Sequence, residues 1–367
     1  MVRIPVKTAS ASYEAVIEHG LLARAGEILR EVLGGTPPLF VVTVPPVRRR
    51  WGTPLLRSLR SAEFDPQIIE MRDGERFKRL SSVEALSEKF LKLGADRKAV
   101  VLAFGGGVVG DVAGMLASVY MRGVKLVQIP TTVQAQLDAA IGGKTGVNLR
   151  AGKNLVGTFY QPQIVLIDPA TLVTLPTREF RAGMYEALKA GVIGNPELFT
   201  RLEKSSIATL RNNKDKDFLT WVLAESVRLK AQVVSADEKE GDLRRVLNFG
   251  HTIGHALEAA TNYRTFLHGE AVAWGMIAAT RISAEIGLCE NAVYDHIARA
   301  TLAWGPLPKV TVQTAKALRL MQSDKKTEAG TIHFVLPREI GRVEMVKSVP
   351  EAAIAAALAE IRRLSRG

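Results

Sequence analysis

Short apolar runs alternate with amphipathic segments along the first half of the chain. The runs are bounded by turn-forming residues and have the length and composition of buried strands. They are Leu39–Val44, Gln67–Met71, Ala99–Phe104, Lys125–Ile129 and Ile164–Ile167. Between them, apolar residues recur at helical spacing in Leu21–Leu33, Ser82–Leu93 and Val108–Tyr120. This repeated order of strand and helix predicts a parallel sheet covered by helices, and the opening segments Arg3–Lys7 and Tyr13–Glu18 can pair as a hairpin.

The pattern changes in the second half. From Arg178 to about Leu302 apolar residues recur at helical spacing, and strand-like alternation is scarce. A short strand is predicted at Ile332–Leu336 and an alanine-rich closing helix at Glu351–Leu364. We therefore predict an α/β domain over residues 1–177 and a mainly α-helical domain over residues 178–367.

Length and composition agree with two globular domains. The chain has 367 residues, of which 47% are hydrophobic and 23% charged, so disorder does not describe it as a whole. No window reaches the roughly 18 uncharged apolar residues of a membrane helix, and the N-terminus lacks the apolar core of a secretory signal. The single cysteine, Cys289, permits no internal disulfide and suits a reducing compartment. We expect a soluble cytoplasmic protein without a membrane partner.

The formal net charge is +12, which favours anionic partners such as nucleic acid or phosphorylated small molecules. Basic residues cluster only at Arg48–Arg50 and around Arg362–Arg366. Neither cluster is interleaved with the aromatic residues on which single-stranded nucleic acids stack. A solvated basic surface is the favoured interpretation, and nucleic-acid binding is the weaker alternative.

A glycine-rich turn follows the strand predicted at Ala99–Phe104. Gly105, Gly107 and Gly110 satisfy the spacing GxGxxG between a strand and a helix. Glycines let the backbone approach a pyrophosphate, and the helix N-terminus supplies unpaired N–H groups. The common dinucleotide fold has an acid about 20 residues later, where this chain has Pro130–Thr132. The motif therefore indicates a less common nucleotide-binding arrangement, or a turn that only needs tight packing.

A second glycine-rich patch spans Gly142–Asn148 and Gly152–Asn154. It is not a P-loop, because Asp138 stands where GxxxxGK[ST] needs its first glycine. Its lysines and asparagines suit a phosphorylated polyol. An ordinary flexible surface loop is the other interpretation, and composition slightly favours it.

Three of the six histidines, His251, His255 and His268, fall within 18 residues. His251 and His255 are four residues apart and share one face of a helix. Thr252 replaces the glutamate that a zinc peptidase has after its first histidine, so a peptidase is disfavoured. Upstream, Glu186 lies one helical turn before Lys189. Catalytic zinc takes about three protein ligands, and two histidines with one glutamate fit that requirement.

These motifs resemble the 3-dehydroquinate synthase family over nearly the whole chain. The segments that carry the resemblance are GGGVVGDVAG, YMRG, PTT, LDAAIGGKTGVN, GKNLVGTF, TLVTLP, GMYEALKAG, DEKEGDLRRVLNFGHTIGHALE, HGEAVAWGM and SDKK. The resemblance implies a homodimer that uses NAD and one divalent metal ion, usually zinc, with cobalt as another possibility. It also implies an active site in the cleft between an α/β and a helical domain. The substrate would be 3-deoxy-D-arabino-heptulosonate 7-phosphate, and the products 3-dehydroquinate and phosphate.

The resemblance also assigns roles to individual residues. The implied metal ligands are Glu186, His251 and His268. The implied catalytic residues are His255, Glu240, Lys144 and Lys189. The implied substrate contacts are Arg122, Asp138, Lys144, Asn154, Lys189, Lys230, Arg244, Asn248 and, of the pair Lys325–Lys326, Lys326. The implied NAD contacts are Glu75, Lys78, Gly106, Gly107, Val108, Asp111, Thr131, Thr132, Lys153, Thr171 and Thr174.

The sequence departs from the family pattern at a few positions. Val41–Pro45 lacks the polar residues that usually hold the adenosine ribose. Gln134, Ala182 and Tyr185 differ from the usual residues near the cofactor and the metal. None of these departures removes a charge that the chemistry needs.

The implied chemistry is a transient oxidation of the substrate by NAD, elimination of phosphate, return of the hydride, ring opening and an intramolecular aldol closure. A metal-dependent NAD polyol dehydrogenase and another sugar-phosphate cyclase are the alternatives. The many cationic positions argue against the dehydrogenase. Arg244, Asn248, His255 and the lysines of the DKK segment, Lys325 and Lys326, favour 3-dehydroquinate synthase over the other cyclases.

Overall fold

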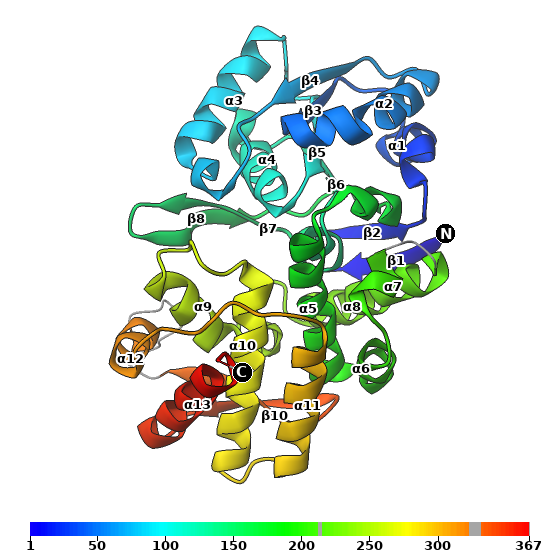
Figure 1. Cartoon of the computed structure of the whole chain (residues 1–367). Helices are drawn as coiled ribbons and strands as arrows, with labels where there is room; N and C mark the ends of the chain where they lie inside the picture. Colours follow the sequence, from blue (N-terminus) through cyan, green and yellow to red (C-terminus); the bar gives the residue numbers. More distant parts are fainter. Residues whose placement is uncertain (212–214, 323–331, 367) are drawn as a thin grey trace. The chain divides into compact units, whose positions relative to one another are not determined.

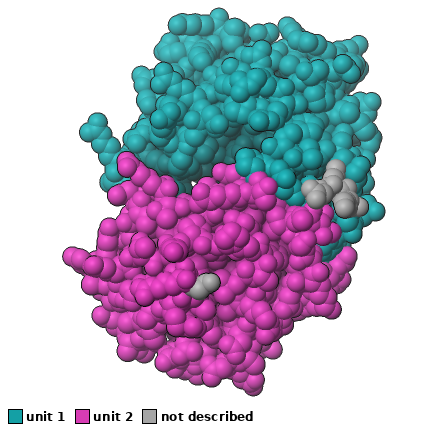
Figure 2. Space-filling model, viewed as in Figure 1, with its two compact units in different colours: residues 1–176, 211–239 teal, residues 177–210, 240–367 magenta. Residues whose placement is uncertain are grey.

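The structure is a computed structural model that describes residues 1–211, 215–322 and 332–366 (Figure 1). It divides into two compact units, which Figure 2 colours separately. Unit 1 comprises residues 1–176 and 211–239, and unit 2 comprises residues 177–210 and 240–367. The first division between the units, after residue 176, lies one residue before the predicted domain boundary after residue 177. The prediction of one uninterrupted C-terminal domain did not anticipate that α8 (Lys216–Ala236) is part of unit 1.

Within the described residues, unit 1 is built on a seven-stranded sheet in the order β1-β2-β9-β6-β5-β3-β4. Only the β1–β2 pair in this sheet is antiparallel, as the predicted hairpin requires. All five predicted strands are confirmed to within about one residue. The strands are β1 (Val2–Lys7), β2 (Ser12–Ile17), β3 (Leu39–Thr43), β4 (Pro66–Glu70), β5 (Val100–Gly105), β6 (Lys125–Pro130) and β9 (Ile164–Ile167).

Helices cover both faces of this sheet (Figure 1). Val41 points into a core with the residues of η1 (Leu21–Arg24), α1 (Ala25–Leu33) and α2 (Pro45–Ser61). Val42, the next residue, points into the opposite core with α3 (Leu80–Lys92) and α4 (Gly107–Val119). Because successive side chains point to opposite faces and both are covered, the strands are apolar without interruption.

The glycine-rich patch after Gly142 is a β-hairpin, not the flexible loop that composition favoured. Strands β7 (Lys144–Leu149) and β8 (Gly152–Phe159) pair antiparallel. A Cβ atom at Gly157 would lie 2.1 Å from the carbonyl oxygen of Thr145. This glycine therefore permits a close approach of two strands, which the composition of the segment does not reveal.

Unit 2 is mainly helical, as predicted. Across the described residues, its helices and those of unit 1 are too short or too polar to cross a membrane. Its elements are α5 (Thr177–Gly194), α6 (Pro196–Glu203), α7 (Ile207–Arg211, whose last residue is assigned to unit 1), η6 (Leu243–Asn248), α9 (His251–Ala260), α10 (His268–Glu285), α11 (Asn291–Ala303), α12 (Thr314–Gln322), β10 (His333–Glu339), β11 (Arg342–Lys347) and α13 (Glu351–Leu364). The closing helix has its predicted bounds, and the strand predicted at Ile332–Leu336 is the first half of the β10–β11 hairpin.

Glycines bring α5, α9 and α10 into backbone contact. A Cβ atom at Gly269 of α10 would lie 1.8 Å from the carbonyl oxygen of Ala182 in α5. A Cβ atom at Gly275 would lie 1.8 Å from the carbonyl oxygen of Gly250, the residue that precedes α9. Only glycine allows so close an approach. The side chains of the candidate metal site come from these three helices.

Candidate active site

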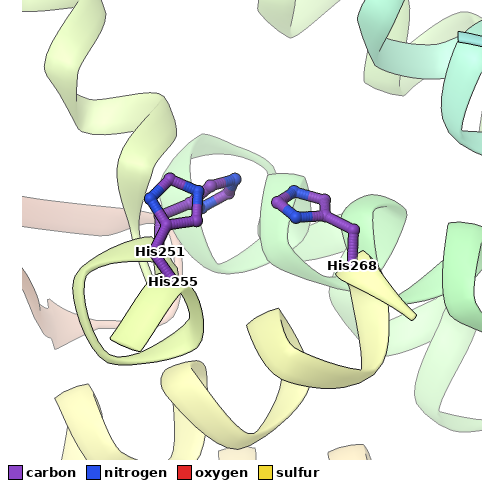
Figure 3. Close-up of side chains that lie close together, drawn as sticks. All are labelled: His251, His255 and His268. Carbon is purple, nitrogen blue, oxygen red and sulfur yellow. The ribbon is translucent and has the colours of Figure 1, made fainter. Parts of the chain in front are cut away.

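Three histidine rings meet in unit 2 (Figure 3). His251 and His255 come from α9, and His268 is the first residue of α10. One ring nitrogen from each lies within 4.8 Å of the other two. Glu186 of α5 lies beside them, with its Oε1 3.4 Å from Nε2 of His268 and 3.9 Å from Nε2 of His251.

His251 and His268 each have Nε2 on the side of Glu186, and the other ring nitrogen, Nδ1, makes a hydrogen bond on the opposite side. Nδ1 of His251 lies 3.1 Å from the carbonyl oxygen of Phe249, and Nδ1 of His268 lies 3.1 Å from Oε2 of Glu258. A carbonyl or carboxylate oxygen can only accept, so both Nδ1 atoms donate. In the neutral rings, the lone pair is therefore on Nε2, which is the tautomer that binds a metal.

These atoms fit a divalent metal ion such as zinc. Bonds of about 2.1 Å in tetrahedral geometry separate two ligand atoms by roughly 3.4 Å. The 3.4 Å separation between Glu186 and His268 equals that value, and the 3.9 Å separation between Glu186 and His251 is about 0.5 Å longer. His255 belongs to the same group of nitrogens. The division of roles between His255 and the other two histidines remains a prediction.

The charges around His268 favour a cation at this place. Burial lowers the pKa of the His268 imidazole, but hydrogen bonds and charges from Glu186 and Glu258 outweigh it and raise the pKa to about 10. A site that binds a proton this strongly is rich in negative charge. A metal ion would replace that proton.

One predicted substrate residue, Lys189, contacts Glu186 directly, and two more are in η6, which Lys189 also contacts. Nζ of Lys189 is 2.6 Å from Oε2 of Glu186 and donates to the carbonyl oxygen of Leu247 at 2.8 Å. The next residue, Asn248, donates through Nδ2 to Oε1 of Glu240 at 3.1 Å. Arg244, in the same short helix η6, is 1% exposed. Helix η6 thus contacts Lys189 and carries two further predicted substrate residues, Arg244 and Asn248.

Unit 1 contains all the predicted NAD contacts. Helix α4 begins directly after β5, and its first-turn N–H groups have no partner within the helix. A Cβ atom at Gly106 would lie 3.0 Å from the Thr132 side chain, and the Thr131 N–H donates a hydrogen bond to the carbonyl oxygen of Gly105. The loops after β5 and β6 therefore meet at the carboxyl ends of parallel strands, where open α/β sheets bind ligands.

A buried lysine links α4 to the β7–β8 hairpin. Lys78 forms an ion pair with Asp111 and donates to Oδ1 of Asn154 at 2.5 Å. Burial raises the pKa of Asp111, and the nearby Lys78 only partly offsets that effect. Asn154 has a φ of 52°, a left-handed conformation that is uncommon outside glycine. Oε1 of Glu75 accepts a hydrogen bond from Asn148, so it too lies against this hairpin.

Two further predicted NAD contacts follow β9 in η5 (Pro169–Thr174). Gln136, which is 0% exposed, donates through Nε2 to the carbonyl oxygen of Pro130 at 3.1 Å and to Oγ1 of Thr171 at 3.0 Å. Oγ1 of Thr174 accepts a hydrogen bond from Trp51. Gln136 connects the ends of β6 and β9, a role that no motif had indicated.

The remaining predicted substrate residues are in different surroundings. Nζ of Lys230 in α8 donates to Oδ1 and to the backbone oxygen of Asp138, both at 2.5 Å. Lys144 is exposed on β7, and Arg122 is exposed at the end of the short helix η3 (Tyr120–Arg122) with a φ of 69°. Lys153 and Val108 are half-buried. Lys326 lies outside the described residues.

Sequence reasoning did not single out Glu258. It is 3% exposed in α9, seven residues after His251 and three after His255. A glutamate among buried apolar residues needs a partner, because an isolated buried charge is strongly destabilising. That requirement is the signal that would have identified it.

Comparisons with known proteins agree with these features. The family model of the 3-dehydroquinate synthase N-terminal domain matches residues 68–182, and that of the C-terminal domain matches residues 183–327. A 3-dehydroquinate synthase from Koribacter versatilis is 51% identical over 365 residues, which cover 100% of this chain and 99% of that protein.

Two solved structures share the architecture. The 2-epi-5-epi-valiolone synthase from Streptomyces hygroscopicus subsp. jinggangensis, with NAD⁺ and Zn²⁺ bound, is 31% identical with a TM-score of 0.87, covering 96% of this chain and 98% of that chain. A 2-deoxy-scyllo-inosose synthase complexed with carbaglucose-6-phosphate, NAD⁺ and Co²⁺ is 26% identical with a TM-score of 0.85. That match covers 98% of this chain and 99% of the other.

Proposed function

The chain belongs to the 3-dehydroquinate synthase family, and we propose that it uses NAD and one divalent metal ion in that reaction. The reaction converts 3-deoxy-D-arabino-heptulosonate 7-phosphate to 3-dehydroquinate and phosphate. We further propose a homodimer in the cytoplasm, without a nucleic-acid or membrane partner. Light scattering of the purified protein at several concentrations tests the dimer.

The observation that carries the proposal is the group formed by Glu186, His251 and His268. Three helices bring one carboxylate oxygen to 3.4 and 3.9 Å from two Nε2 atoms. Zinc or cobalt suits one carboxylate and two imidazoles. The zinc and the cobalt bound to the two similar cyclases support this choice.

When bound, the metal ion supplies Lewis-acid polarisation of a substrate hydroxyl, and NAD supplies a reversible hydride acceptor. The protein's own residues hold the reactants. The N-terminus of α4 and the threonines after β6 would cradle the pyrophosphate of NAD. Lys78, paired with Asp111, would fix that end of the cofactor site.

The cationic residues would hold the two anionic groups of the substrate. Lys189 contacts Glu186, Arg244 is buried in η6, and Lys144 and Lys230 belong to unit 1. Charge-assisted hydrogen bonds to phosphate and carboxylate are stronger than neutral ones and fix the bound conformer. A ring nitrogen of His255 would hold and move a proton, because imidazole titrates near neutrality.

The test is a paired measurement of phosphate release and NADH absorbance at substoichiometric NAD. Because the hydride is returned within each turnover, we expect many equivalents of phosphate per NAD without a matching rise in NADH. A dehydrogenase would accumulate one NADH per substrate and release no phosphate, which would overturn the proposal. Parallel assays with sedoheptulose 7-phosphate test the substrate, and faster release from that sugar would refute the heptulosonate assignment.

A further inference from the structure

Glu258 connects α9 and α10, two of the three helices that carry the proposed metal ligands Glu186, His251 and His268. Its carboxylate, in α9, lies 3.1 Å from Nδ1 of His268 in α10 and is almost completely buried. The carboxylate accepts and Nδ1 donates. The hydrogen bond therefore fixes both the tautomer and the orientation of the His268 ring, and it directs Nε2 toward Oε1 of Glu186.

The two proposed histidine ligands are supported differently. His251 donates to a backbone carbonyl, that of Phe249, which is neutral and cannot be removed by substitution. His268 donates to a carboxylate, which carries a full negative charge and depends on one side chain. A carboxylate behind an imidazole makes the ring a more basic metal ligand than a carbonyl does.

Glu258 also contributes to the charge near the proposed ion. Glu186 carries one negative charge, but the ammonium group of Lys189 lies 2.6 Å from it and offsets that charge. Two neutral imidazoles add none. Glu258 adds a buried negative charge behind His268, which helps to balance a divalent cation there.

We propose that Glu258 is a positioning residue for the metal ion: it orients His268 for coordination and supplies the second negative charge beside the site. This inference rests on the proposed function, because it assumes that the ion binds at Glu186, His251 and His268. Glu258 does not itself coordinate the ion in this proposal.

The experiment measures metal affinity and coordination directly, independently of turnover. Zinc affinities of the full chain are compared by competition with a chelator for the parent, Glu258→Gln and Glu258→Ala. The absorption spectrum of each cobalt-loaded protein reports the geometry around the ion. We expect zinc affinity to fall about 10-fold in Glu258→Gln, which keeps a hydrogen-bond acceptor, and about 100-fold in Glu258→Ala. The cobalt spectrum should change most in Glu258→Ala.

A second histidine–glutamate pair provides the matched control. Oε1 of Glu203 lies 2.8 Å from Nε2 of His296, and neither residue is part of the histidine group. Glu203→Gln makes the same chemical change and should leave zinc affinity and the cobalt spectrum unchanged. Thermal unfolding of the metal-free variants verifies that they fold. If Glu258→Ala does not fold, the comparison of the parent with Glu258→Gln is the test.

The outcomes separate this inference from the proposed function. If the parent binds no zinc or cobalt, the proposed metal dependence fails. If the parent binds metal and both Glu258 variants bind it with parental affinity and spectrum, only the positioning role fails. Lower thermal stability of the metal-free variants with unchanged metal affinity would also overturn the inference, because Glu258 would then only join two helices.

Discussion

Lys189 and Glu186 form a buried ion pair one turn apart on α5, with Nζ 2.6 Å from Oε2 and both side chains at most 5% exposed. Removing one partner of such a pair costs about 3–5 kcal/mol when the other charge is left uncompensated, and the protonated His268 beside Glu186 keeps the cost here toward the lower value. We expect Lys189→Met to lower the free energy of unfolding of the metal-free protein by this amount. Zinc should recover most of the loss, because it places a cation beside Glu186 again.

Urea denaturation of parent and variant, with and without zinc, measures this prediction. The quantity compared is the difference in free energy of unfolding between parent and variant, measured once without zinc and once with it. An equal difference in the two forms would show that the ion does not contact Glu186.

The histidine group predicts a division between metal binding and turnover. We expect His251→Ala and Glu186→Ala to lose metal affinity, because each removes a proposed ligand atom. His255→Ala should retain the metal and lose much of its turnover. Metal analysis of each purified variant, together with phosphate-release rates, measures both properties. Equal metal loss in all three variants would place His255 among the ligands.

A third prediction concerns Lys78 and Asp111 in unit 1. Lys78→Met should destabilise the protein by about 3 kcal/mol near pH 8, because it leaves the Asp111 carboxylate without its cation. The loss should shrink toward pH 5. Burial already raises the pKa of Asp111, and without Lys78 that carboxyl is protonated more readily. Denaturation curves at both pH values measure the change.

A double variant tests whether the two side chains act as a pair. Lys78→Met with Asp111→Asn should cost less than the sum of the two single changes. Strict additivity would mean that the ion pair contributes nothing beyond packing.

A fourth prediction concerns stability in acid. The Glu360 carboxylate of α13 accepts hydrogen bonds from Arg363 and from Tyr294 Oη, and these lower its pKa from 4.5 to about 2. A carboxyl group whose pKa falls on folding stabilises the fold above its unfolded pKa, and that contribution is lost as the pH falls through the folded value. Glu360→Gln should therefore be less stable than the parent near pH 6, and the two should converge near pH 2.

The size of this effect is modest. Arg363 is largely exposed, so solvent screens the pair, and we expect only a small difference. Thermal unfolding across this pH range measures it. A difference that stays constant down to pH 2 would indicate lost packing and not lost charge.

The sheet of unit 1 was predictable because its strands are buried on both faces, which leaves short apolar runs between turns. Helix α2 was missed. Pro45, Pro46 and Pro54 and the run Arg48–Arg50 obscure its apolar positions. The return of α8 to unit 1 was also missed, because helical periodicity shows that a face is buried but not which unit buries it.

Local spacing revealed part of the candidate site. The four-residue interval between His251 and His255 places both rings on one face of α9 whatever the surroundings are. The support of His268 by Glu258 depends on how α9 packs against α10, and no interval in the sequence encodes that. Gln136 was missed for the same reason, since its partners follow two strands that lie apart in the sequence.

The close backbone contacts at Gly269 and Gly275 also limit which amino-acid substitutions this protein can tolerate. A single added methyl group at either position would meet a carbonyl oxygen at 1.8 Å. In a saturation mutagenesis library, these two glycines should therefore tolerate substitution as poorly as the proposed metal ligands, although they carry no reactive group. Laboratory evolution toward another metal or sugar would have to keep both glycines and vary the side chains around them.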